Sequence, residues 1–350
     1  MKILYFYAEV MGYTEATFEA LIDQGAELHI VNWDKKKLTP HQLRHVSTIN
    51  FYDRSSFSTQ ELYELMRSIH PDCIVVSGWM DYGYLSAARL AMTELSIPIV
   101  CCLDSQWNGT LKQCIAAVIA KIGFFKRYFT HMWVSGTYQF EYARKLQFSK
   151  QEIIFDLYSA HLSLFHKSFY ENKQEKLSAY PKRFLYVGRF EPVKNISLLL
   201  EAWEEIKLSR HGWELLFIGT GSMEKELKNI EGVSVKTFLT QAELALEVSH
   251  SGCFILPSSY EPWGVVLHEF SAAGLPIICS DVCGASTSFI IPGNNGFIFK
   301  SGQKDSLISK IQKIISLSDD ELNKMSHASF SLSQRISPET SAANLLSLLR

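Results

Sequence analysis

Short apolar runs alternate with amphipathic segments along most of the chain, and this alternation narrows the folds open to it. Each run is nearly continuous in apolar character, which suits strands of a parallel sheet that is covered on both faces. Segments 14–24, 60–69 and 84–95 have the spacing of amphipathic helices. The repeated strand–helix order predicts an α/β fold of Rossmann-like, doubly wound sheets. The runs interpreted as strands are KILYFYA (2–8), ELHIVN (27–32), DCIVVSG (72–78), PIVCCL (98–103), HMWVSG (131–136), EIIFDL (152–157), FLYVG (184–188), WELLFIG (213–219), VSVKTF (233–238), GCFILP (252–257), LPIICS (275–280) and NGFIF (295–299).

A polar stretch, HKSFYENKQEKLSAYPKR (166–183), separates two series of such runs. Its scarcity of apolar residues predicts a linker. The chain of 350 residues is also long enough for about two domains. We therefore expect domains over 1–168 and 180–336, with the carboxyl ends of their strands facing each other across a cleft. The tail, 337–350, has a helical pattern and could pack back on the first domain.

Composition and charge argue against several classes of protein. The formal net charge of −2 gives no indication of a nucleic-acid partner. Seven cysteines without a CxxC motif or regular Cys/His spacing argue against a zinc site and indicate reduced thiols in the cytoplasm. The N-terminal run lacks a signal-peptide cleavage pattern, and no apolar run approaches the ~20 residues that cross a bilayer. The sequence therefore predicts a soluble or peripheral protein. The lysines at 35–37 follow a predicted strand and are expected in an exposed turn.

The stretch SSYEPWGVVLHEFSAAGLPIICS (258–280) places two glutamates, Glu261 and Glu269, around the expected start of a helix. Glu261 lies in the loop that follows a predicted strand, and Gly264 lets the chain approach a ligand closely. Backbone amides at a helix start favour anions, and carboxylates accept hydrogen bonds from sugar hydroxyls. The pattern indicates a ligand with a phosphate between two hydroxyl-rich groups. Two solvated glutamates near a helix start are the alternative.

A second cluster, VGRFEPVKN (187–195), places Arg189 and Lys194 just after a predicted strand that ends at Gly188. Both cations are thus expected at the carboxyl edge of a sheet, where ligands bind. Arginine can contact two phosphate oxygens at once, so the pair suits a diphosphate. A surface salt bridge is the alternative for Arg189 alone.

These motifs together resemble the donor domain of the GT-B glycosyltransferases, and in particular glycosyltransferase family 4, whose members are retaining enzymes of bacterial polysaccharide and glycolipid assembly. The resemblance covers most of 184–299 and includes an E-x7-E element. It implies a two-domain GT-B fold and a nucleoside-diphosphate sugar, of UDP or GDP type, as donor. The matching stretches are VGRFEPVKN, FIGTGSMEKEL, VKTFLTQAEL, FILPSSYEPWGVVLHEFSAAGLPIICSDVCGASTSFI and PGNNGFIF.

The resemblance implies roles for individual residues. Glu261 would bind hydroxyls of the donor sugar, and Glu269 would hold the ribose. Arg189 and Lys194 would stabilise the leaving diphosphate. The remaining donor contacts would come from Lys236 and Phe238 near the base, Trp263 at the sugar pocket, the backbone of Gly264, Val265 and Val266, and the strand end at Gly188.

The first half matches this family less closely. The loop after its first strand, AEVMGYTEA, has one glycine, Gly12, where the family often has a glycine-rich phosphate contact. The family often carries a histidine after the fourth strand. The corresponding stretch here is CCLDSQWNGT, in which Asp104 stands closest to the position of that histidine. Asp104 is interpreted as an acceptor-side base or as a group that orients a hydroxyl. Its alternative role is to cap the next helix, for which Asn108 and Thr110 compete.

The function that follows is transfer of a hexose-type sugar, with retention of configuration, to a hydroxyl of a glycan or a lipid-linked acceptor. Retention is implied by the family and not by the residues themselves. No DxD motif follows a strand, so neither a metal nor another cofactor is expected. The alternatives are a glycoside hydrolase, which also uses two carboxylates, and a non-catalytic nucleotide-sugar sensor. An oxidoreductase is disfavoured because no GxGxxG follows the first strand.

Residues 105–150 form a locally cationic segment that contains a single acidic residue, Glu141. The run IGFFKRYF (122–129) places aromatics beside cations, a combination that suits an anionic membrane surface. We therefore expect peripheral contact with the cytoplasmic face of a membrane. Solvated helix faces over a core are the alternative. The basic residues are Lys112, Lys121, Lys126, Arg127, Arg144, Lys145 and Lys150.

Overall fold

The computed structural model describes residues 1–33 and 49–349. The lysines at 35–37 lie outside these residues. The described chain divides into an N-terminal unit, made of 1–160 and 336–350, and a C-terminal unit, 161–335. Within the described residues, no helix has both the length and the apolar character needed to cross a membrane.

The N-terminal unit is built on a parallel sheet with the strand order β3-β2-β1-β4-β5-β6-β7. Because the order reverses between β1 and β4, the carboxyl ends of these two strands flank a topological switch point, where open α/β sheets bind ligands. The parallel, doubly wound arrangement that the apolar runs predicted is confirmed. The strands are β1 (Lys2–Tyr7), β2 (Glu27–Asn32), β3 (Ile49–Asp53), β4 (Cys73–Val76), β5 (Ile99–Leu103), β6 (His131–Val134) and β7 (Ile153–Ile154).

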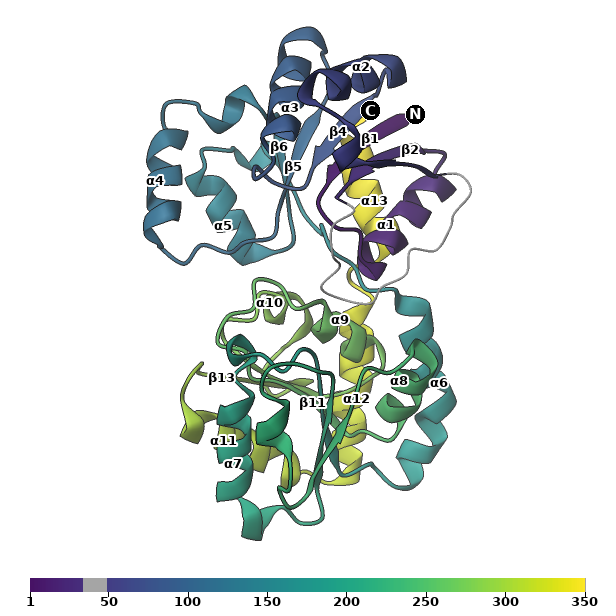
Figure 1. Ribbon diagram of the computed structural model, residues 1–350. Coiled ribbons are helices and arrows are strands. Elements are labelled where there is room, and N and C mark those ends of the chain that lie inside the picture. The colour runs from purple at the N-terminus through teal and green to yellow at the C-terminus, as the bar shows by residue number, and fades with distance from the viewer. Residues whose placement is uncertain (34–48, 350) are drawn as a thin grey trace. The chain divides into compact units, whose positions relative to one another are not determined.

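Alternation along β1 explains how one strand serves two helical layers. Leu4 and Phe6 pack into a core with helices α2, α3 and α5, whereas Ile3 and Tyr5 pack into a core with α1 and α13. The C-terminal helix α13 thus belongs to this unit and lies beside α1 (Figure 1). The helices of the unit are α1 (Gly12–Asp23), α2 (Thr59–Ile69), α3 (Tyr82–Glu94), α4 (Leu111–Ala120), α5 (Thr137–Lys145) and α13 (Pro338–Leu346).

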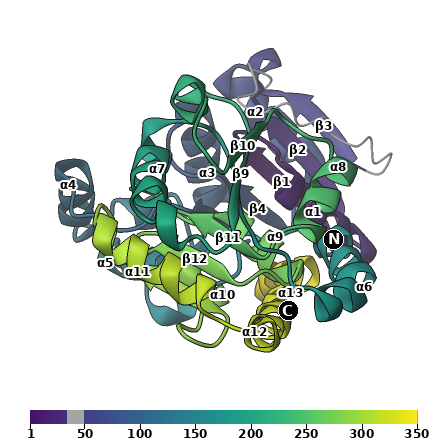
Figure 2. The same cartoon turned by 90° about the horizontal axis from the view of Figure 1, so that it is seen from below.

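The C-terminal unit has a second parallel sheet, with the order β10-β9-β8-β11-β12-β13. Its switch point lies between β8 and β11, so the loops after these strands are neighbours at one edge. Helices α7 and α11 cover one face, and α6, α8, α9 and α12 cover the other (Figures 1 and 2). The strands are β8 (Arg183–Val187), β9 (Glu214–Ile218), β10 (Val233–Lys236), β11 (Cys253–Leu256), β12 (Ile277–Ser280) and β13 (Gly296–Phe299). The helices are α6 (Leu162–Ser178), α7 (Ile196–Glu205), α8 (Gln241–Ser249), α9 (Val265–Ala272), α10 (Ser286–Phe289), α11 (Lys304–Ile315) and α12 (Asp319–Ser333).

The prediction of a linker over 166–183 is wrong for most of its length, because α6 occupies it. This helix buries two aromatic side chains, Phe165 and Phe169, and exposes most of its other side chains to solvent. Phe169 stacks on Phe330 of α12 with ring centroids 4.1 Å apart. A long helix held by a few large anchors is polar over most of its surface, which explains the misinterpretation.

Two other local features differ from the sequence-based expectation. Strand β3 was not predicted, since the edge strand INFYD is only partly buried and lacks a continuous apolar run. The aromatics of 122–129, expected to face a membrane, lie instead in the core: Phe125 and Phe129 are buried, and Phe124 and Tyr128 pack against the same cluster. Lys126 in this run forms an ion pair with Glu152 and lies over the ring of Phe148.

Candidate functional site

Four loops meet at the carboxyl edge of the C-terminal sheet, around its switch point. Backbone hydrogen bonds join them in pairs. The amide of Ser259, after β11, donates to the carbonyl of Val193, after β8, at 2.9 Å. The amide of Gly284, after β12, donates to the carbonyl of Glu261 at 3.1 Å, and the amide of Phe190 donates to Thr220 at 2.8 Å. The loops therefore form one connected backbone frame rather than separate mobile segments.

Glycines allow two of these loops to approach each other closely. A Cβ on Gly219 would lie 2.0 Å from the carbonyl oxygen of Gly188, and a Cβ on Gly221 would lie 2.4 Å from that of Phe190. Both distances are far below any van der Waals contact. The glycines of VGRF and FIGTGS thus set the positions of the neighbouring polar side chains.

We expect Gly219→Ala to destabilise the protein strongly. The left-handed φ of +149° and the clash with a backbone oxygen should together cost about 2–3 kcal/mol of unfolding free energy. Chemical denaturation measures the loss. Gly302→Ala is the matched control, because its φ of +75° is also left-handed but no atom lies within 4 Å. Equal losses in the two variants would contradict the close approach described here.

The structure brings Lys194 and Glu261 together. The Lys194 Nζ lies 2.5 Å from Glu261 Oε2, and the side chains are only 17% and 12% exposed. Ser258 donates its hydroxyl to the same carboxylate oxygen at 3.2 Å. Lys194 reaches this position from the short turn Pro192–Lys194 after β8, and Glu261 from the loop after β11. An ammonium has three donors and a carboxylate about four acceptor positions, so both groups retain capacity for a ligand.

Arg189 is the cation that the structure leaves exposed at this edge. No ion pair to its guanidinium is found among residues 1–33 and 49–349. Its backbone carbonyl accepts a hydrogen bond from the hydroxyl of Tyr186 at 2.9 Å, which ties the loop after β8 to the side chain of a strand residue. The alternative role as a surface salt bridge therefore has no partner in the described part of the chain.

Helix α9 begins immediately after Gly264, whose φ of 90° is left-handed. No side chain caps this helix start, so the amides of Val265 and Val266 remain available to an anion. A Cβ on Gly264 would lie 3.0 Å from Cγ of Glu261. The first turn of the helix, the glycine and the carboxylate are thus packed together.

Glu269 lies one turn further along α9 and is half-buried. Among the described residues, its carboxyl group has no hydrogen-bond or ion-pair partner. Burial raises the pKa of Glu269 to about 7. The two glutamates therefore differ, since Glu261 is paired with a cation and Glu269 exchanges its proton near neutral pH.

The other side chains predicted to contact the donor are Trp263, Lys236 and Phe238, and they differ in burial and in their partners. Trp263 is 3% exposed, and its indole Nε1 is buried without a hydrogen-bond partner in the described structure. Lys236 at the end of β10 forms an ion pair with Glu247. Glu247 forms a second ion pair, in which its Oε2 lies 2.9 Å from the guanidinium of Arg183. Phe238 is 64% exposed. No contact found in the described structure joins Lys236 or Phe238 to the cluster of Lys194 and Glu261.

Asp104 lies at the carboxyl end of β5 in the N-terminal unit and is exposed. The hydroxyl of Tyr158 donates to its Oδ2 at 3.4 Å. The alternative role as a helix cap is wrong, because Thr110 caps α4 through a hydrogen bond from the amide of Gln113. Gly12 is the first residue of α1, at the switch-point side of the same sheet.

The C-terminal frame has a clear counterpart among known proteins. Residues 169–330 match the family model of the Glycosyl transferases group 1. The matched segment contains all the C-terminal candidate residues, from Gly188 to Glu269.

Curated relatives match a little over a third of the chain. An uncharacterized glycosyltransferase of Methanocaldococcus jannaschii is 31% identical over 142 residues, 39% of this chain and 36% of that protein. The capsular polysaccharide biosynthesis glycosyltransferase CapM of Staphylococcus aureus is 28% identical over 140 residues, 37% of this chain and 36% of CapM. The first three relatives are matched over only 30% to 42% of their own length.

Solved structures extend the similarity to both units. A glycosyltransferase from Rickettsia africae superposes with a TM-score of 0.76 at 14% identity, over 99% of this chain and 97% of that one. Anabaena HepE, solved in complex with UDP, superposes with a TM-score of 0.74 at 15% identity over 99% of both chains. At these identities the likeness concerns the fold alone. The chain has the two-domain, Rossmann-like GT-B fold that its motifs implied.

Sequence reasoning about this GT-B chain missed residues at the N-terminal switch point. Glu9 follows β1, and its Oε1 is buried without a hydrogen-bond partner among the described residues. Tyr13 and Tyr158 pack edge to face with ring centroids 4.9 Å apart, beside Asp104. Their positions after strand ends were a usable signal, because such loops line the ligand edge of α/β sheets. The first loop, AEVMGYTEA, thus offers the carboxylate of Glu9 in addition to its single glycine.

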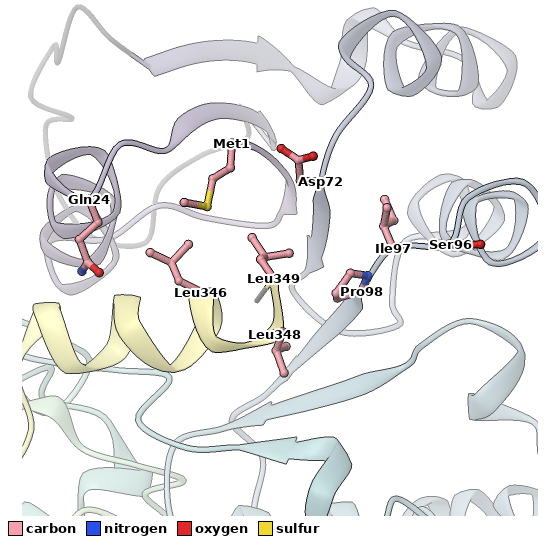
Figure 3. Close-up of a pocket in the computed structure, with 9 residues that line it drawn as sticks. All are labelled: Met1, Gln24, Asp72, Ser96, Ile97, Pro98, Leu346, Leu348 and Leu349. Carbon is pink, nitrogen blue, oxygen red and sulfur yellow. The ribbon is translucent and has the colours of Figure 1, made fainter.

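A cavity of about 570 Å³ in the N-terminal unit lies away from these residues (Figure 3). It is formed at the amino-terminal side of the sheet, where Met1, Asp72 and Pro98 precede β1, β4 and β5, and the end of the chain at Leu348 and Leu349 closes it. Ligands of α/β sheets bind at the opposite, carboxyl edge. We therefore do not assign this cavity to the candidate site. No cluster of three or more potential metal ligands occurs within the described residues.

Proposed function

We propose that this protein is a retaining glycosyltransferase that moves a sugar from a nucleoside-diphosphate donor, of UDP or GDP type, to an acceptor hydroxyl. The observation that carries the proposal is the pairing of Lys194 with Glu261 beside the uncapped start of α9. A cation, a carboxylate and free amides lie together at a switch point, and these groups match a phosphate attached to a sugar. The similarity to group 1 glycosyl transferases supports the same conclusion.

The diphosphate is held by Arg189, by Lys194 and by the amides at the start of α9. Lys194 keeps its contact with Glu261 and donates a further N–H to phosphate, since an ammonium has three donors. Glu261, aligned by Lys194 and Ser258, accepts hydroxyls of the transferred sugar. The indole Nε1 of Trp263, which has no hydrogen-bond partner among the described residues, is a further donor for this pocket.

At the other end of the donor, Glu269 accepts the hydroxyls of the ribose. Phe238 offers an exposed ring to the base, and Lys236 lies at the end of the preceding strand. The complexes of Anabaena HepE with UDP and with UDP-glucose support a donor of this class. Both complexes match the fold of this protein over 99% of its length.

In the reaction, positive charge develops on the sugar and negative charge on the leaving phosphate. The cations and the helix amides stabilise that negative charge without reorganisation, because the backbone frame already fixes them. A front-face displacement, in which the leaving phosphate helps to deprotonate the acceptor, accounts for retention. The chain's own groups suffice for these roles, and the mechanism requires no metal ligand from the protein.

The acceptor is proposed to be a glycan or a lipid-linked hydroxyl bound at the carboxyl edge of the N-terminal sheet. Asp104 and Glu9 provide carboxylates there, and Tyr158 orients Asp104. The names of two similar proteins, CapM in capsular polysaccharide biosynthesis and the lipopolysaccharide outer core galactosyltransferase WaaB, support polysaccharide or lipopolysaccharide assembly. The seven free cysteines support a cytoplasmic reaction.

A glycoside hydrolase is the less supported alternative. Such an enzyme needs two carboxyl groups as acid and as base or nucleophile. Here one of the two is neutralised by Lys194, and the nearby anion-binding groups have no role in hydrolysis of a neutral glycoside. A nucleotide-sugar sensor would bind the donor without turnover.

Thermal unfolding with a panel of nucleoside diphosphates and nucleotide sugars tests the proposal. A ligand present at 100 times its Kd stabilises the folded state by about 2.7 kcal/mol, which shifts the Tm measurably. Turnover assays with the binding donors and candidate acceptors then separate an enzyme from a sensor. A chain that ignores every nucleoside diphosphate would contradict the proposal, and binding without transfer to any acceptor would favour the sensor.

We expect donor binding to depend on the protonation of Glu269. Because its pKa is about 7, the carboxylate that accepts ribose hydroxyls forms as pH rises from 6 to 8. Affinity for a UDP-sugar, whose phosphates do not titrate in this range, should rise about tenfold and then level off. Titration calorimetry between pH 5.5 and 8.5 measures the change, and Glu269→Gln should remove the dependence.

The same pKa predicts an opposite effect on the stability of the free protein. The folded state holds the Glu269 proton more tightly than the unfolded chain, in which the pKa of this carboxyl group is near 4.5. Stability is therefore lost as pH rises from about 4.5 through 7, and Glu269→Gln should raise the Tm at pH 8 more than at pH 5. A pH-independent Tm difference would show that the carboxyl group is not desolvated.

A further inference from the structure

Helix α4 lies at the outer edge of the N-terminal unit (Figure 1). One face of this helix carries an exposed apolar stripe. Leu111, Ile115, Val118 and Ile122 are 76%, 53%, 63% and 72% exposed. They recur at intervals of four, three and four residues, so they lie on one helical face. Ile122 follows the helix end, but the turn continues in the same sense, with its amide bonded to the carbonyl of Ile119. This stripe, named here the α4 stripe, exposes four branched aliphatic side chains within a dozen residues.

The opposite face of α4 already has a partner in the fold. Ala120 is buried, and Ala116 and Ile119 pack against the core that contains Phe125 and Phe129. These contacts fix the rotation of α4 about its axis. The apolar side chains of the stripe are therefore exposed while another face of the helix packs against the core. Single exposed aliphatics are common on protein surfaces, whereas a continuous stripe on one element marks an interaction surface.

Charge lies on both sides of the α4 stripe. At 100° per residue, Lys112 and Lys121 project to opposite flanks of it, and both are exposed. Among the described residues, neither lysine forms an ion pair. Between residues 105 and 140 the sequence contains no acidic residue. An apolar line with cations at its borders is the arrangement of a helix that lies in a membrane interface.

We propose that the α4 stripe docks this protein on an anionic membrane surface, with the aliphatic side chains among the lipid acyl chains and the two lysines at the head groups. A second copy of the chain fits less well, because pairing two stripes would bring four lysines together. A stable protein interface also uses about 20–30 residues from each partner, whereas the α4 stripe offers four side chains. The proposal stands apart from the donor chemistry, since α4 contributes no residue to the donor site.

The expected membrane contact over 105–150 was based partly on the aromatic run 122–129. Phe125 and Phe129 of that run are core residues, so the contact passes to the exposed face of α4, whose flanking lysines Lys112 and Lys121 belong to the same cationic segment. The expected binding is weak and reversible, because one stripe and two cations resemble a single lipid-anchoring signal rather than two. Anionic lipid and low salt should both strengthen it.

Flotation of the full chain with lipid vesicles tests the proposal. The protein should float with phosphatidylcholine–phosphatidylglycerol vesicles and much less with phosphatidylcholine alone. Ile115→Gln with Val118→Gln, and separately Lys112→Glu with Lys121→Glu, should each lower the bound fraction. Loss of the two lysine charges alone corresponds to about 30-fold in partition coefficient, and the two added carboxylates should make the decrease larger. Leu208→Gln, at a fully exposed leucine of the other unit, and Lys182→Glu with Lys228→Glu are the matched controls and should float like the unmodified protein.

Cys114 offers a second readout in the native sequence. It is exposed beside the α4 stripe, whereas the other six cysteines are buried. A polarity-sensitive fluorophore on Cys114 should shift to the blue when anionic vesicles are added, and the shift should be lost in the Ile115→Gln, Val118→Gln variant. No flotation with anionic vesicles, equal flotation with neutral ones, or a concentration-dependent dimer that these variants abolish would each overturn the proposal. Unchanged UDP or GDP binding in the variants keeps this outcome separate from the test of the donor site.

Discussion

Glu261→Gln is expected to lower kcat about a hundred- to a thousand-fold, because the carboxylate that positions the donor sugar is removed. It should also destabilise the protein, since it leaves the mostly buried ammonium of Lys194 without its partner. Breaking a buried pair by removing one member typically costs about 3–5 kcal/mol, and the residual exposure here places the expected loss at the lower end. A control must therefore separate the loss of activity from the loss of stability.

The control is a double-mutant cycle with Lys194→Met. Each single variant should lose stability, and the double variant should recover part of that loss because no unpaired charge remains. Activity should stay low in all three variants, since each lacks a group that contacts the donor. Chemical denaturation and initial rates measure the two effects separately. Full recovery of activity in the double variant would show that the pair is structural and not part of the donor site.

Arg189→Ala is expected to lower kcat by a similar factor, about a hundred- to a thousand-fold, while leaving the Tm unchanged. The guanidinium is exposed and has no ion-pair partner in the described structure, so its loss leaves no unsatisfied group. The effect should also appear as weaker binding of UDP or GDP. Arg335→Ala, another exposed arginine of the C-terminal unit, is the matched control. Retained activity in Arg189→Ala would remove this residue from the mechanism.

Much of the architecture was predictable because strands covered on both faces leave a distinct apolar pattern. The runs around β1, β8 and β11 were recognised for that reason, whereas the half-buried edge strand β3 was not. The prediction of a linker over 166–183 was wrong because a surface helix leaves only a weak apolar pattern. A surface helix such as α6 needs only a few anchors, and Phe165 and Phe169 are too few to outweigh its polar residues.

The candidate residues could be named from the sequence, but their contacts could not. Lys194 and Glu261 are separated by 67 positions, and only the strand order, with β8 beside β11, brings them together. The raised pKa of Glu269, whose carboxyl group has no partner in the described part of the chain, depends on burial, which sequence spacing does not reveal. Asp104 was rightly placed after a strand, but its exclusion as the helix cap required the hydrogen bond that the Thr110 hydroxyl accepts from the amide of Gln113.

The most direct test is a crystal structure of the protein with UDP or GDP. Our account predicts the diphosphate within hydrogen-bond distance of Arg189, of Lys194 and of the amides of Val265 and Val266, with the ribose at Glu269. A diphosphate bound instead beside Gly12, or in the cavity between Met1 and Leu349, would contradict it.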